Sequence, residues 1–123
     1  MHQNDGISSR FATVIGAFLL IEGVWGLFSP VVFGVLTTNT LHACIHIVLG
    51  VIGLYTGMKG GARGFSLYLG ILLVAVGVMR FLPVLGDITV SLLNVNQAVA
   101  IFNIVVGLIA IVVARASGPA KLA

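Results

Sequence analysis

The sequence predicts an all-α integral membrane protein, a bundle of four transmembrane helices built from two tandem two-helix repeats with both termini in the cytoplasm. Its composition, the spacing of four apolar segments and the placement of the basic residues predict this fold. Of 123 residues, 59% are hydrophobic and only 7% are charged, and the mean hydropathy is +1.22. A soluble domain of this size has too little interior to hide so much apolar surface. We therefore expect the chain to lie in a lipid bilayer.

Four apolar segments give the expected positions of the helices. Each has roughly the 17–20 residues that cross a hydrocarbon core of about 30 Å as a helix; the segments are 11–28, 41–57, 65–82 and 98–114. The motifs "LFSP" and "FLP" close the first and third, where proline ends a helix at little cost. The predicted domains are a cytoplasmic head (1–10), a transmembrane domain (11–114) and a cytoplasmic tail (115–123). Since the connections leave no room for a soluble catalytic module, we expect no enzymatic activity.

The basic residues predict the orientation of the helices. They flank the membrane segments on one side only, at Arg10, Lys59, Arg63, Arg115 and Lys121, whereas the stretches 29–40 and 83–97 contain no Lys or Arg. Such an asymmetry is typical of cytoplasmic loops. We expect a multi-pass membrane protein whose basic side chains contact anionic lipid headgroups on the cytoplasmic side. The net charge of +3 then reflects topology, and no nucleic-acid partner is expected.

An internal repeat relates the two halves. "FATVIGAFLLIEGV" (11–24) aligns with "FSLYLGILLVAVGV" (65–78), and "NTLHACIHIVLGVI" (39–52) aligns with "NQAVAIFNIVVGLI" (96–109). The register matches Asn39 with Asn96 and sets His46 against Asn103. Because each repeat (about 11–57 and 65–114) has two helices, we expect a pseudo-twofold axis along the membrane normal.

Glycines recur at helix-packing spacings in both halves. Seven-residue and GxxxG spacings place them on single helix faces, where a neighbouring backbone can approach closely. The predicted packing positions are Gly16, Gly23, Gly26, Gly50, Gly53, Gly57, Gly70, Gly77 and Gly107. The same faces leave association with other membrane subunits open.

Two charged residues fall inside the predicted membrane segments. Counted at 1.5 Å per residue, Glu22 lies about 16 Å into the first helix, and Arg80 about 22 Å into the third. Each charge costs about 2.5–3.5 kcal/mol on insertion scales. Arg80 aligns with Gly26, one turn beyond Glu22, so we expect a buried Glu22–Arg80 ion pair with Gly26 making room for the guanidinium. In the alternative, Arg80 reaches the outer surface or Asp87.

His42 and His46 lie four residues apart, on one face of the second predicted helix. Together with Glu22, Arg80 and Asn103, they fall in the outer half of the bundle. Three interpretations stay open. The histidines hydrogen-bond across helices to Asn103, a loop carbonyl or Glu22; they bind a metal, haem or chlorin; or they form a proton or cation path with Glu22.

The run "NTLHACIHIVLGVIGL" resembles the signature of domain-of-unknown-function family 4383, small bacterial membrane proteins with four predicted helices. The pattern Asn39, His42, His46 and Gly50 is the most specific part of the resemblance, which extends over about 11–114. The resemblance implies this architecture, in the cytoplasmic (inner) membrane of a bacterium, and no assigned activity. Between the histidines, this chain has Ala43 and Cys44 where the family favours Asn and an aliphatic residue.

These observations lead to one expected function and two alternatives. We expect a non-enzymatic accessory or structural subunit beside a larger membrane assembly, with the lipid bilayer and other membrane proteins as its partners. The alternatives are a protein that binds haem, chlorin or a metal at His42 and His46, and a small proton or cation transporter that uses Glu22.

Overall fold

A computed structural model describes residues 6–117, and this part of the chain contains five helices and one small hairpin. The elements are α1 (Gly6–Phe28), β1 (Val31–Val32), β2 (Leu36–Thr37), α2 (Thr40–Lys59), α3 (Ala62–Arg80), α4 (Leu85–Leu93) and α5 (Gln97–Ala116). Helices α1, α2, α3 and α5 are long and apolar enough to cross a membrane. The prediction of an all-α fold with four helices able to span a membrane is confirmed.

The helix bounds differ from the prediction mainly at two places. Helix α1 begins at Gly6, so residues 6–10 of the predicted head belong to the helix, and α3 ends at Arg80, before the predicted limit. The sequence also did not predict α4 or the β1–β2 hairpin, because both are short and follow proline-containing stretches that resemble simple loops. The tail position Lys121 lies outside the described residues.

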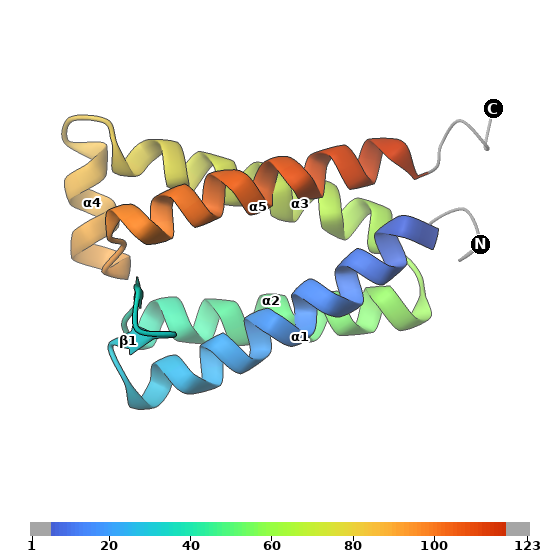
Figure 1. Cartoon of the computed structure of the whole chain (residues 1–123), viewed down its shortest axis with the longest axis horizontal. Helices are drawn as coiled ribbons and strands as arrows, with labels where there is room; N and C mark the ends of the chain where they lie inside the picture. The colour runs from blue at the N-terminus through green and yellow to red at the C-terminus, as the bar shows by residue number, and fades with distance from the viewer. Residues whose placement is uncertain (1–5, 118–123) are drawn as a thin grey trace.

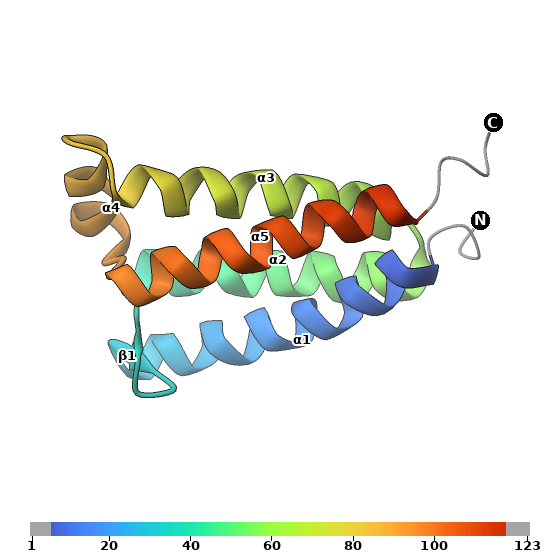
Figure 2. The same cartoon turned by 45° about the horizontal axis from the view of Figure 1, so that its top comes forward.

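The four long helices form two antiparallel pairs, α1 with α2 and α3 with α5 (Figure 1). Contact between the two pairs is less extensive than contact within each pair. The β1–β2 hairpin and α4 lie at one end of the bundle, which we call the loop end (Figure 2). The start of α1 and the end of α5 meet at the opposite, terminal end, where the Ser8 and Ser117 hydroxyls form a hydrogen bond.

Glycines bring the helix backbones together inside each pair. A Cβ atom added at Gly16 would lie 2.8 Å from the carbonyl oxygen of Gly50, and one at Gly70 would lie 2.7 Å from that of Gly107. Real Cβ atoms do not approach backbone this closely, so side chains at these positions would force the helices apart. Gly23, Gly53, Gly57 and Gly77 likewise face the partner helix of their own pair.

Apolar side chains fill the space between the pairs. Ile15 and Leu19 of α1 meet Leu69 and Leu73 of α3 in a buried cluster. Around the outside, large apolar side chains are exposed on each long helix, among them Val14, Val48, Tyr68 and Val112. An apolar interior with an equally apolar exterior is the arrangement expected of helices surrounded by lipid.

Candidate functional site

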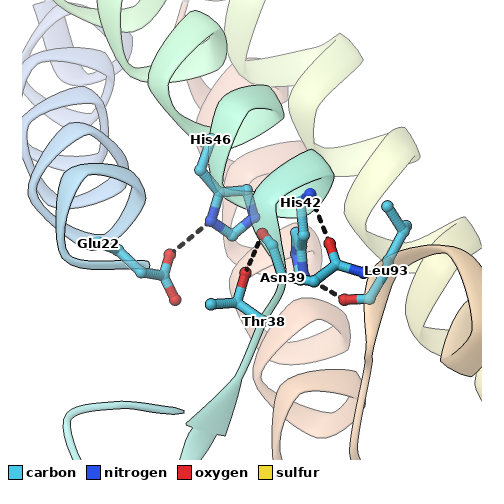
Figure 3. A network of polar contacts seen from close by, with 6 residues as sticks. All are labelled: Glu22, Thr38, Asn39, His42, His46 and Leu93. Carbon is cyan, nitrogen blue, oxygen red and sulfur yellow. Dashed lines mark hydrogen bonds and ion pairs between the residues drawn. The ribbon is translucent and has the colours of Figure 1, made fainter. Parts of the chain in front are cut away.

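The buried carboxylate of Glu22 pairs with an imidazole. Glu22 projects from α1 and is only 6% exposed, and its Oε1 lies 2.8 Å from Nδ1 of His46 on α2 (Figure 3). The contact is an ion pair whenever the imidazole carries both of its protons, while Oε1 makes no hydrogen bond of standard geometry within residues 6–117. His46 is also buried. The two helices of the first pair therefore share this contact.

The predicted ion pair between Glu22 and Arg80 is wrong. Arg80 Nε donates to the backbone carbonyl of Val95 at 2.8 Å, at the loop end of the bundle. Arg80 occupies the last turn of α3, where its long side chain reaches the polar loop carbonyls more readily than the deeper Glu22. Gly26 does not accommodate the guanidinium either, since a Cβ there would lie 2.8 Å from Cγ2 of Thr38.

His42 lies one turn closer to the loop end and bonds to a backbone carbonyl. Its Nδ1 is 2.9 Å from the carbonyl oxygen of Leu93, at the end of α4 (Figure 3). Because a carbonyl oxygen only accepts, His42 Nδ1 carries the proton, and in the neutral ring Nε2 keeps its lone pair. The rings of His42 and His46 meet edge to face, with centroids 4.3 Å apart. Glu22, His46 and His42 thus form a continuous row that ends at the Leu93 carbonyl.

Both imidazoles line a small cavity between α2 and α3. Its volume is about 90 Å³, and its walls are His42, Ile45, His46, Leu49, Leu72, Leu73, Val76, Leu93 and Asn103. Asn103 of α5 is 3% exposed and lines the same cavity. The structure therefore brings together three of the predicted polar residues, the two histidines and Asn103, around one space.

The first interpretation of the histidines, polar contacts across helices, is met by a hydrogen bond at His42 and by an ion-pair contact at His46. His46 meets Glu22 and His42 meets a loop carbonyl, whereas neither ring bonds to Asn103. Sequence reasoning missed Leu93 because its contribution is a backbone carbonyl, which any residue supplies. It also missed Ile45 and Leu72, which leave no polar signal in the sequence although their size shapes the cavity.

The sequence profile of a family described as a domain of unknown function, DUF4383, matches residues 9–116. The chain belongs to the DUF4383 family. No curated protein and no solved structure matches it. In this DUF4383 protein, the pattern that carried the resemblance covers one continuous region: Asn39 caps α2, His42 and His46 line the cavity, and Gly50 packs against α1.

The size of the cavity and its donor set limit what the DUF4383 site can hold. Pockets that enclose larger organic ligands measure about 300–1,000 Å³, so a cavity of about 90 Å³ does not enclose a haem or chlorin. An ion with a few waters does fit, since a water takes about 30 Å³. Residues 6–117 contain no cluster of three or more His, Cys, Asp or Glu side chains suited to a metal ion. A ligand at this site would therefore meet two imidazoles and one amide.

Proposed function

We propose that this protein is a non-enzymatic membrane protein that binds a small ligand in the cavity between α2 and α3. The observation that carries the proposal is the meeting of two buried imidazoles and a buried amide around one space in an apolar interior. Polar side chains at membrane depth are costly and most often mark a site of binding or transport.

The proposed repeat strengthens this argument. In the alignment of the two halves, Gly16 and Gly50 correspond to Gly70 and Gly107, and each of these two pairs makes the same close backbone contact. The matching contacts support two tandem hairpins around a pseudo-twofold axis. On this basis, the groove between α2 and α3 has a counterpart between α5 and α1.

The two grooves are filled differently. In the counterpart groove, Phe18 and Phe102 lie with ring centroids 5.5 Å apart, and Phe33 stacks on Phe18 at the same distance. The aligned positions in the cavity groove are Leu72 and Ile45. One groove is thus closed by aromatic rings, and the other keeps an open space beside the histidines. We take this difference as support for a ligand in the groove between α2 and α3.

Native mass spectrometry of the protein released from its own membranes tests the proposal. We expect a bound species that is lost in the double variant Ile45→Phe with Leu72→Phe, which copies the aromatic residues of the counterpart groove and leaves every polar group in place. The matched control, Phe18→Leu with Phe102→Ile, changes only the counterpart groove and should keep the bound species. A parent protein that carries nothing beyond lipid contradicts the proposal.

The accessory-subunit role is compatible with ligand binding and remains part of the proposal. Its support is the ring of exposed apolar side chains, such as Tyr68 and Val112, which can contact either lipid or a neighbouring membrane protein. Crosslinking in native membranes followed by mild-detergent purification tests it. A lone monomer with no crosslinked membrane complex would count against an accessory role.

We also propose that both termini face the cytoplasm of a bacterial cell. Support comes from Arg10, Lys59, Arg63 and Arg115, which all belong to the terminal end of the bundle. Single cysteines in a Cys44→Ser background test the orientation, with Val35→Cys at the loop end and Met58→Cys near the terminal end. A membrane-impermeant maleimide should label the first in intact cells and the second only after lysis; the reverse pattern contradicts the proposed orientation.

A further inference from the structure

We infer that the ligand of the cavity is a divalent first-row transition-metal ion, bound through Nε2 of His42 and His46. The inference rests on the proposed function, because it names the chemical class of the ligand for the same site. Three features carry it: the contact of each Nδ1 atom with an oxygen, the shared cavity, and the Asn103 amide on the cavity wall.

The bonding of the imidazoles is the arrangement found behind metal-bound histidines. Such histidines donate their second ring nitrogen to a carboxylate or a backbone carbonyl, which fixes the tautomer and the ring orientation. His46 has the Glu22 carboxylate at 2.8 Å, and His42 has the Leu93 carbonyl at 2.9 Å. Because Nδ1 of each ring faces an oxygen, Nε2 is the nitrogen that each ring offers to a ligand.

The donor set selects the class of ion. Imidazole nitrogens suit Zn²⁺, Cu²⁺ and Ni²⁺ better than the oxygen-preferring Mg²⁺ and Ca²⁺. Asn103 lines the cavity from α5, so its amide oxygen could serve as a further ligand, and the cavity leaves room for water at the remaining positions. Within the part of the chain that the structure describes, this gives an open site with two imidazole ligands, unlike the closed four-ligand sites of structural zinc.

Glu22 acts here as a positioning residue. It orients His46 and balances part of the charge of the ion without serving as a ligand. Removing the oxygen partner of a metal-bound histidine weakens metal affinity about 10–100-fold. This role therefore predicts a partial loss of metal affinity in Glu22→Gln and a complete loss in a variant that lacks one of the ligating histidines.

Metal titration of the full chain in lipid nanodiscs tests the inference. The protein carries no histidine tag, and every sample has the change His2→Gln, because an imidazole next to the amino terminus also binds these ions. Calorimetry with Zn²⁺ should show one ion per chain, and Cu²⁺ should show electron-paramagnetic couplings to two imidazole nitrogens. We expect His46→Asn and His42→Val, which install the residues at the aligned positions of the other half, to abolish binding of Zn²⁺. Glu22→Gln should weaken it about 10–100-fold.

The groove variants distinguish a specific loss of metal binding from a general loss of folding. Ile45→Phe with Leu72→Phe keeps both histidines and should lose Zn²⁺, whereas Phe18→Leu with Phe102→Ile should keep it. Equal Zn²⁺ affinity in the parent, His46→Asn and Ile45→Phe with Leu72→Phe overturns the inference. If native mass spectrometry finds an organic species that depends on the cavity while Zn²⁺ does not bind, the metal inference fails and the binding function stands. If neither is found, both fail.

Discussion

Asn39 and Asn96 make reciprocal contacts across the two halves of the protein. Each side chain caps the helix that follows it, with Oδ1 accepting from the backbone N–H of His42 at 2.9 Å and of Val99 at 2.8 Å, respectively. Each Nδ2 then donates to the opposite half, Asn39 to the Leu92 carbonyl and Asn96 to the Val35 carbonyl. At the loop end, each of the two asparagines thus caps one helix and forms one hydrogen bond to the other half.

The reciprocal contacts predict similar losses for changes at either asparagine. Loss of the cap and of the cross-half hydrogen bond in Asn39→Ala or Asn96→Ala should lower the free energy of unfolding by about 1–2 kcal/mol. Asn39→Asp keeps the capping oxygen and loses only the donor, so its loss should be smaller. Unfolding in mixed micelles by increasing fractions of sodium dodecyl sulfate measures these differences. An Asp variant as damaging as the Ala variant would show that the cap contributes little.

The pairing of Glu22 with His46 predicts a coupling that Arg80 does not share. In a double-mutant cycle, Glu22→Leu with His46→Leu should lose less stability than the two single losses added, by about 0.5–3 kcal/mol. Glu22→Leu with Arg80→Leu should be additive within about 0.5 kcal/mol, because these side chains are not in contact. The same micelle unfolding measures both cycles. Coupling in the Arg80 cycle alone would contradict the observed pairing.

The glycine contacts predict large losses where backbone approaches backbone. An added Cβ at Gly50 would lie 2.6 Å from the amide nitrogen of Leu20, so Gly50→Ala should destabilise the α1–α2 pair by about 1–3 kcal/mol. Gly107→Ala should do the same to α3–α5, since its Cβ would lie 2.8 Å from the Gly70 carbonyl. Gly64→Ala is the control, because no atom lies within 4 Å of its added Cβ. It should be neutral or stabilising.

The apolar cluster predicts that Glu22 does not conduct protons across the membrane. Ile15, Leu19, Leu69 and Leu73 fill the bundle on the terminal side of the carboxylate, and they offer no hydrogen-bonding group along which a proton could move. Proteoliposomes carrying the parent protein and Glu22→Gln should therefore show the same passive proton flux under an imposed pH gradient. A flux in the parent that disappears in Glu22→Gln would instead support the transport alternative.

Much of the fold was predictable because lipid restricts the choices of the chain. Uninterrupted apolar segments have no way other than a helix to satisfy their backbone in lipid. The starts of α2 and α5 follow from Asn39 and Asn96, which cap them. Helix α4 and the β1–β2 hairpin were not predictable in this way, since they lie outside the long apolar runs. Their place follows from contacts with the other half, such as the Thr37 hydroxyl donating to the Asn94 carbonyl.

The candidate site was predictable in its residues and not in its pairings. Glu22, His42 and His46 stand out because polar groups are rare at membrane depth, and periodicity puts both histidines on one helix face. Which partner Glu22 takes depends on the rotation of α1 against α2 and α3, and glycine contacts such as Gly16 with Gly50 set that rotation. The depth estimate treated Arg80 as a neighbour, but depth alone does not give the side of the helix.

The chain connects its two helix pairs at the terminal end through a single tight turn, with Gly60 and Gly61 at positive φ angles. Each pair contains its own glycine-packed interface, and the loop end supplies hydrogen bonds that do not depend on this turn. The turn therefore keeps the two helix pairs close together in the chain, but the contacts that hold the pairs together do not depend on it. Two co-expressed fragments, 1–60 and 61–123, have the surfaces needed to find each other in the bilayer, as two subunits of a heterodimer would.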